Sequence, residues 1–410
     1  MKNIRSASIL NDLPTTEFDV VLLGVNLPGV LLAWHLASAG KKVALFCADD
    51  FARRDDFRFT QIFPGNIKSV AKARPQLEMA AKMRRHAPYL FLQQRMIWLR
   101  GNPLANKLVT QAYNQLSVRS HSERAGTLNL TDYPDYELFA KNGYSHGILC
   151  REYRYNHSRL VMEWLKAASR AGAFVGNFVE ANRHEGKALQ LDDKISGESK
   201  MIDAEKVIQL ISNPRLFTFT VNLPNDEWNN PVRISGEKAD YILSPEGEVV
   251  RVTAYCNIAP DAKGLIHKEF CQLFSLQEED ISPAENREKN FAHPVESDLT
   301  LSDLPVEIME EELSRLFPEY MEWKLPDNWF RGEDDRHISQ VFEMAQRKFY
   351  EAKQTGIDET WFMELFYRYG NAIDELTEMA YGGMSETRDP ILLWEKSILK
   401  FEREQEWRMQ

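Results

Sequence analysis

The apolar and polar positions near the N-terminus alternate in a way that predicts a strand, a tight turn, a helix and a second strand. Asp19–Leu23 is a short, mostly apolar run that is typical of a buried strand. Val30–Ala39 has apolar residues at helical spacing and ends at Gly40, and Val43–Phe46 is a second apolar run. This order is typical of the βαβ unit of dinucleotide-binding folds, in which the first turn presents backbone N–H groups to a pyrophosphate.

The turn after the first strand has two of the three glycines of the G-x-G-x-x-G fingerprint. Gly24 and Gly29 stand at the outer positions, and Asn26 stands at the middle one, where the backbone should come closest to the phosphates. Cys47 replaces the acidic residue that holds the ribose at the end of the second strand. The glycines could hold a pyrophosphate or only permit the tight turn. Asn26 could be a turn residue in left-handed geometry, and Cys47 a buried, inert thiol.

The middle of the chain is predicted to complete this sheet and to add a hairpin. The pattern predicts a helix, a strand, a hairpin and a buried strand, in this order: Ser158–Ala171, Phe174–Asn182, Lys187–Ala204 and Val207–Ile211. We expect 19–23, 43–46 and 207–211 to lie side by side in one parallel sheet, because βαβ crossovers bury such strands on both faces. Val232–Ala259 is predicted to form a second hairpin, which turns at residues 245–247.

The chain beyond residue 300 is predicted to be helical. Helical spacing marks four segments there and one earlier segment: Pro305–Phe317, Arg336–Ala352, Glu359–Ala380, Ile391–Trp407 and Arg74–His86. Large apolar side chains form a stripe along one of these segments: Phe362, Leu365, Phe366, Tyr369 and Ile373. Such a stripe could line a cofactor, but packing in a hydrophobic core is the more common use of this pattern.

The composition limits the classes of function. A chain of 410 residues leaves room for about two or three domains with sizeable cores. The formal net charge of −11 disfavours nonspecific nucleic-acid binding, which requires a basic face. The N-terminal segment lacks the apolar core of a signal peptide and the cysteines lack CxxC spacing, so a cytoplasmic location is expected. No set of His, Cys, Asp and Glu has the spacing of metal ligands, and no metal site is predicted.

Several segments match the motifs of one known family, in the same order along the chain. The family pattern VALVEKGDFASGTSSRSSKLIHGGLRYL aligns without gaps onto residues 43–70. RNAPHLV resembles Arg85–Phe91, and DARLVLLNALDAAERGA resembles residues 157–173. LxxRYGxxAxEVL resembles Leu365–Leu376. In these segments the chain resembles the FAD-dependent glycerol-3-phosphate dehydrogenases and glycerophosphate oxidases. The resemblance covers about half of the chain, and the order of the segments makes it fairly specific.

The resemblance implies an α/β fold with three parts. A Rossmann-like FAD-binding-type domain would comprise residues 18–75 and 151–215. An antiparallel substrate domain would be inserted as residues 76–150 and 216–300, and a C-terminal α-helical domain would follow from 301 to 410. The implied activity is the oxidation of a small phosphorylated alcohol, with FAD as cofactor and with electrons passed to quinone or oxygen. The residues expected to bind the cofactor are Gly24, Asn26, Gly29, Cys47, Arg58 and Gly65. No catalytic residue is assigned.

The chain departs from the family at positions that carry the chemistry. The small-residue loop SGTS is replaced by Arg53–Asp56, whose two carboxylates would repel a pyrophosphate. The lysine and histidine of SKLIHGG are replaced by Gln61 and Pro64. These changes support an alternative hypothesis, in which the chain keeps the scaffold without flavin and acts by binding. In that case a protein partner would bind through the helical domain, or the chain would contact a membrane peripherally.

Overall fold

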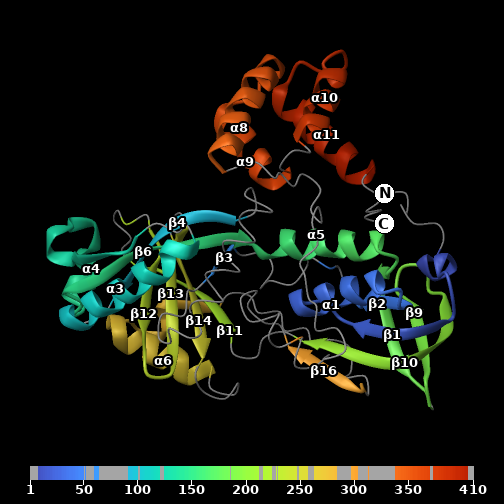
Figure 1. The fold of residues 1–410 in the computed structure, drawn as a ribbon, viewed down its shortest axis with the longest axis horizontal. Helices are drawn as coiled ribbons and strands as arrows, with labels where there is room; N and C mark the ends of the chain where they lie inside the picture. Colours follow the sequence, from blue (N-terminus) through green and yellow to red (C-terminus); the bar gives the residue numbers. More distant parts are fainter. Residues whose placement is uncertain are drawn as a thin grey trace.

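The computed structural model describes most of the chain, in the ranges 8–49, 51, 60–63, 91–99, 102–120, 124–184, 186–211, 216–223, 228, 230–246, 249–256, 263–283, 297–302, 313, 338–369 and 373–404. Two β-sheets lie at opposite ends of the long axis, and a group of helices lies beside them (Figure 1). The predicted helix Arg74–His86 lies outside the described residues, as does Pro305–Phe317 except for Leu313.

The first sheet has a parallel centre with the order β7-β2-β1-β10-β16. Val21 lies opposite Ala44 on one side and Val207 on the other, so the predicted adjacency of the three apolar runs is confirmed. The strands of this centre are β1 (Glu17–Leu23), β2 (Val43–Cys47), β7 (Phe174–Asn177), β10 (Ser199–Ile211) and β16 (Leu299–Ser302).

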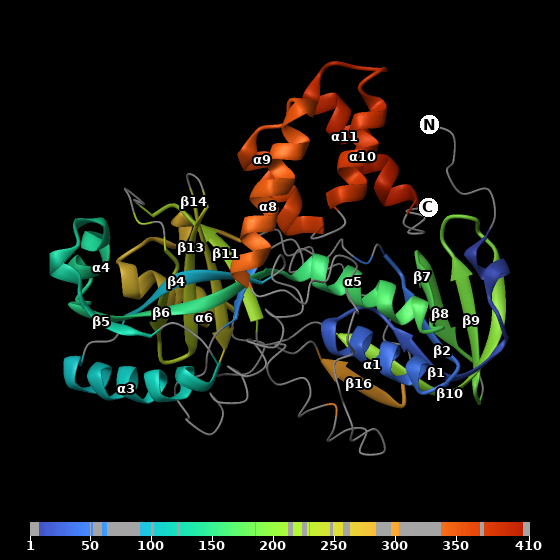
Figure 2. The same cartoon turned by 45° about the horizontal axis from the view of Figure 1, so that its top comes forward.

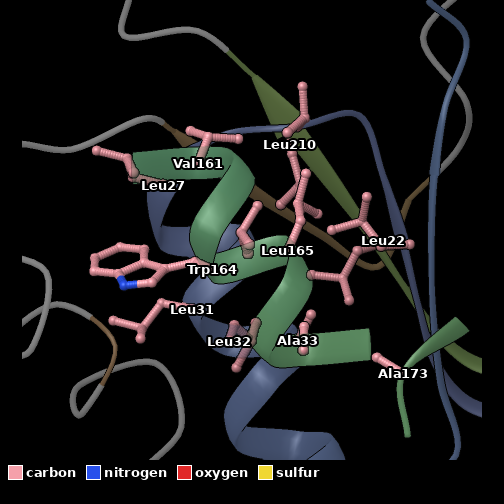
Figure 3. Packing of buried hydrophobic residues seen from close by; sticks show 14 of the residues in the cluster. Leu22, Leu27, Leu31, Leu32, Ala33, Val161, Trp164, Leu165, Ala173 and Leu210 are labelled. Carbon is pink, nitrogen blue, oxygen red and sulfur yellow. The ribbon is translucent and has the colours of Figure 1, made fainter. Parts of the chain in front are cut away.

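The parallel centre is buried on both faces, because successive side chains of each strand point in opposite directions. Val20 and Leu22 belong to the cluster that packs under α1 (Leu27–Ser38) and α5 (His157–Arg170). Figure 3 shows Trp164 and Leu165 of α5 against side chains of α1 and of the sheet. The opposite face is covered by β8 (Val179–Arg183), β9 (Ala188–Asp193) and the short 3-10 helix η1 (Ile9–Asp12).

Two strand boundaries differ from the prediction. Phe174–Asn182 was expected to be one strand, but Phe178 has a φ of 57° and splits it into β7 and β8. The left-handed residue changes the direction of the chain. As a result β7 pairs with β2, whereas β8 pairs with β9. The predicted strand Val207–Ile211 is the end of the longer β10, whose first half forms the predicted hairpin with β9.

The second sheet is mostly antiparallel and has the order β15-β11-β14-β13-β12-β4-β6-β3, with β5 beside β6. The predicted hairpin Val232–Ala259 is formed by β13 and β14, while its first residues form the separate strand β12. Three helices lie beside this sheet: α3 (Pro103–Ser120), α4 (Glu137–Lys141) and α6 (Lys263–Phe274). Its strands are β3 (Thr60–Phe63), β4 (Phe91–Leu99), β5 (Gly126–Asn129), β6 (His146–Asn156), β11 (Leu216–Val221), β12 (Val232–Ser235), β13 (Ala239–Glu246), β14 (Val249–Cys256) and β15 (Ile281–Pro283).

The C-terminal part of the described chain is helical, as predicted, and forms a group of its own beside the sheets (Figure 2). The expected helix Glu359–Ala380 is divided into α9 and α10. The predicted apolar stripe packs in the core of this group, where Phe362, Leu365, Phe366 and Ile373 are buried. The interpretation of the stripe as core is therefore confirmed for these residues. The helices are α8 (Ile338–Ala352), α9 (Glu359–Tyr369), α10 (Ile373–Gly383) and α11 (Pro390–Glu404).

A glycine pair in the first βαβ unit allows the cost of a backbone contact to be measured. Gly24 has a φ of 101°, and a Cβ there would lie 2.6 Å from the carbonyl oxygen of Leu210. Gly40 has a φ of 80°, but a Cβ there would meet nothing within 4 Å. We expect Gly40→Ala to cost about 1 kcal/mol and Gly24→Ala about 2 kcal/mol more, because only the latter adds a clash with backbone. Urea unfolding of both variants measures this difference, and equal losses would contradict it.

The burial of His35 in α1 predicts a pH-dependent stability. Burial lowers the pKa of His35 from 6.5 to about 4. The unfolded chain therefore takes up this proton at a higher pH than the folded chain does, and stability is lost as the pH falls from 6.5 towards 4. Between about pH 7.5 and about pH 5, we expect this residue to account for about 1–2 kcal/mol of the lost unfolding free energy. His35→Gln should lose that much less over the same interval, as measured by urea unfolding at both pH values.

Candidate functional site

The topology of the first sheet marks one edge as the place for a ligand. From β1 the chain proceeds to β2 and β7 on one side, whereas β10 and β16 lie on the other side. The strand order therefore reverses between β1 and β10. In open parallel sheets, ligands bind outside the carboxyl ends of the strands at such a switch point. The turn from β1 into α1 lies at this point.

Both predicted glycines of this turn are required by packing against Leu210 of β10. The backbone of Gly24 comes so close to the carbonyl oxygen of Leu210 that no side chain fits, and its N–H donates to the carbonyl of Phe46 at 2.8 Å. A Cβ on Gly29 would lie 2.3 and 2.4 Å from the two methyl carbons of Leu210. The fold alone therefore accounts for both glycines, and neither one by itself indicates a ligand.

Asn26 has a specific structural use. Its side chain is fully buried, and its Oδ1 accepts the N–H of Gly29 at 2.8 Å as the N-cap of α1. Its Nδ2 donates to the carbonyls of Ile211 at 3.0 Å and Leu301 at 2.8 Å. The φ of Asn26 is −158°, which is extended backbone, so the interpretation of a left-handed turn residue is wrong. The asparagine is needed for its amide, which joins α1 to the carboxyl ends of β10 and β16.

These contacts determine which donors the first turn of α1 presents at the sheet edge. Pro28 has no N–H, and the N–H of Gly29 is bound to Asn26 Oδ1. The N–H of Val30 donates to the carbonyl of Asn26 at 3.0 Å, as in any helix. The switch point and the glycine turn thus suit a dinucleotide, but the second and third helical positions offer no N–H to its phosphates in this arrangement.

Cys47 ends β2 at the same edge of the sheet. The residue is 2% exposed and lies opposite Asn177 of β7. Burial agrees with a structural cysteine, because the reactive thiolate form requires access to solvent or to a cationic partner. The structure therefore brings Gly24, Asn26, Gly29 and Cys47 together. Arg58 and Gly65 lie outside the described residues, as does the loop 53–56.

The hydrogen bonds that Asn26 makes at both ends of its amide were not predicted from the sequence, although the sequence does show the pattern of an N-cap. An asparagine followed by Leu27 and Pro28 has the pattern of an N-cap with proline in the first helical turn. This pattern would have placed the helix start at residue 27 instead of 30. Its partner Leu301 lies on β16, a strand of four residues that is too short to give a periodic signal.

Buried polar groups in the second sheet hold the fold together. Glu269 of α6 accepts the N–H of Glu237 at 2.7 Å and of Lys238 at 3.0 Å, and it also accepts the hydroxyl of Tyr241. Burial and the nearby Glu269 raise the pKa of Tyr241, and the same two causes raise the pKa of Cys256 to about 11. Since every one of these bonds joins α6 to β13 or to the turn before it, the network is structural.

The described residues include neither a metal-ligand cluster nor a helix suited to the lipid core. No group of three or more His, Cys, Asp and Glu side chains lies close enough to hold a metal ion within the described ranges. His146 contacts Ser145 and His267 contacts Phe219, and the two histidines do not share a site. None of the described helices combines the length and the apolar character needed to cross a membrane.

The sequence of the chain is similar to those of known enzymes over about half of its length. No protein-family model matches the chain. The aerobic glycerol-3-phosphate dehydrogenase of Staphylococcus saprophyticus is 28% identical over 227 residues, which are 51% of this chain and 40% of the relative. The enzyme of the same name from Staphylococcus haemolyticus is 26% identical over 227 residues, with the same coverage. The match thus spans less than half of the length of these curated relatives.

A solved structure extends the similarity to nearly the whole chain. The glycerol-3-phosphate dehydrogenase from Bacillus halodurans, which was solved in complex with FAD, superposes with a TM-score of 0.64 and 15% identity. The superposition covers 96% of this chain and 84% of the solved one. The predicted fold class is confirmed: an α/β fold with a Rossmann-like FAD-binding-type domain, an antiparallel sheet domain and C-terminal helices. Over about half of its length, the chain is therefore similar in sequence to the aerobic glycerol-3-phosphate dehydrogenases, as its sequence motifs indicated.

Proposed function

We propose that this chain is a FAD-dependent oxidoreductase of the glycerol-3-phosphate dehydrogenase type, which acts on a small phosphorylated alcohol. The observation that carries the proposal is the switch point of the parallel sheet beside the β1–α1 turn, in a chain whose curated relatives are aerobic glycerol-3-phosphate dehydrogenases. The domain division follows from the same proposal: 18–75 with 151–215 would bind FAD, and 76–150 with 216–300 would cover the substrate.

The residues at the sheet edge would orient the cofactor. Acceptance of a hydride from the alcohol carbon is the chemistry that FAD would supply, so the part left to the protein is position and electrostatics. The backbone of Gly24 would approach the pyrophosphate, and Gly29 lets α1 pack closely against Leu210 of β10. Cys47 would lie near the ribose, and its thiol is a weaker hydrogen-bonding partner than the carboxylate usual at this position. We therefore expect the ribose to be held mainly by backbone groups.

A second candidate function is binding without redox chemistry. It is favoured by the first turn of α1, where Pro28 lacks an N–H and Asn26 caps Gly29. Under this alternative, the scaffold would present the helical group α8–α11 to a protein partner, and no flavin would be bound. The net charge of −11 makes nucleic acid an unsuitable partner for either candidate.

The visible spectrum of the purified chain, with a dye-coupled assay for glycerol 3-phosphate, separates the two candidates. We expect the spectrum of bound flavin and only slow oxidation of glycerol 3-phosphate compared with the curated relatives. Catalysis needs the reacting carbon about 3–3.5 Å from the flavin, and a displacement of about 1 Å can cost about a hundredfold in rate. The replaced loop at 53–56 and the changes to Gln61 and Pro64 would displace it.

Two variants control this experiment. Gly29→Val should lose flavin, because its side chain would displace Leu210 and the α1 terminus. Gly40→Ala, whose Cβ meets nothing within 4 Å, should keep it. A folded chain that stays colourless with added FAD would reject the proposal in favour of the binding function. Turnover as fast as that of the relatives would show that the substituted loop residues are not needed for catalysis.

A further inference from the structure

The N-terminus of α1 is already capped by a side chain of the protein itself. A helix N-terminus attracts anions because its first N–H groups lack partners within the helix. Here the Oδ1 of Asn26 accepts the N–H of Gly29 at 2.8 Å, in the role that a phosphate oxygen has in a dinucleotide site. Since Pro28 has no N–H, this is the one donor that the second and third positions of the helix provide.

The capping side chain is held in place from its other end. Its Nδ2 donates to the carbonyls of Ile211 at 3.0 Å and Leu301 at 2.8 Å. The strands that carry these two carbonyls, β10 and β16, end beside each other. The Asn26 amide is completely buried between them and α1. A phosphate that takes the Gly29 N–H must therefore displace an amide that makes hydrogen bonds at both ends. Each such bond is worth roughly fivefold in an equilibrium constant.

We infer that Asn26 lowers the affinity of this chain for FAD by occupying the phosphate position at the N-terminus of α1. The inference rests on the proposed function for its choice of ligand. It makes Asn26 a residue that sets cofactor affinity. A glycine at this position, as the fingerprint requires, would leave the Gly29 N–H to the pyrophosphate. The backbone of residue 26 is extended, so a glycine is tolerated there but is not required by the conformation.

Titration of FAD into the flavin-free full-length chain, followed by flavin fluorescence, tests the inference. Asn26→Gly should bind FAD about tenfold more tightly or better, because a donor to a charged phosphate replaces a donor to a neutral amide. Asn26→Asp should bind about tenfold more weakly, since it keeps an acceptor for the Gly29 N–H, loses the two bonds that Nδ2 donates, and sets a negative charge against the pyrophosphate. Circular dichroism establishes that each variant is folded, and the Asp variant carries the test if the Gly variant is not.

A matched control separates the cap from the attachment of β16. Asp298 holds the start of β16 as Asn26 holds its end: its Oδ2 accepts the N–H of Val207 at 2.7 Å, and its Oδ1 accepts from Arg183 at 3.2 Å. Asp298→Ala should lower the thermal stability, as Asn26→Gly does, but leave the dissociation constant for FAD within about twofold. A tighter complex in the Asp298 variant would show that a loosened β16 is the cause, and it would overturn the inference.

The remaining outcomes distinguish the inference from the proposed function. Equal affinity of the natural chain and Asn26→Gly, or weaker binding by the Gly variant, overturns the role of Asn26 but leaves FAD binding intact. Absence of FAD binding in the natural chain and in all folded variants overturns the proposed function itself, and the inference with it. Tighter binding by the Gly variant and weaker binding by the Asp variant support both.

Discussion

The contact of the β1–α1 turn with Leu210 is the constraint on which the N-terminal half of the fold depends. Leu210 lies in β10, far along the chain from the turn, yet it leaves no space for a side chain at Gly24 or at Gly29. The backbone of the turn meets the Leu210 carbonyl, and α1 meets its methyl groups. Because interiors are packed to the density of organic crystals, a single added carbon here has no space. The position of α1 above the sheet, and hence of its N-terminus at the switch point, follows from this contact.

Hydrogen bonds close to this contact also explain how β16, a strand from a distant part of the sequence, joins the sheet. β16 pairs with β10 through four residues, which is little for a strand at the edge of a parallel sheet. Side-chain hydrogen bonds fix it at both ends: Asp298 accepts the N–H of Val207, and Asn26 donates to the carbonyl of Leu301. The amide of Asn26 therefore serves the fold and caps the helix at once, and its two tasks cannot be changed independently.

Much of the fold could be predicted from the sequence because its central strands are short apolar runs that are separated by a helical pattern and by glycines. The periodic signal identified β1, α1, β2 and α5, and family motifs supplied the overall arrangement. The split at Phe178 was missed because a non-glycine residue in left-handed geometry leaves no compositional mark. The second helix boundary within Glu359–Ala380 was missed because apolar spacing continues across it.

The candidate site was harder to predict than the fold, since the roles of its residues depend on contacts between segments far apart in the chain. The sequence shows that Asn26 breaks the fingerprint, but its partner Leu301 is 275 residues away. No local pattern can report that the amide is held by two carbonyls and is therefore a fixed cap. Whether a broken fingerprint weakens cofactor binding depends on how firmly the substituted side chain is held. Here it is buried and hydrogen-bonded at both ends, so the substitution changes the chemistry of the helix terminus as well as its shape.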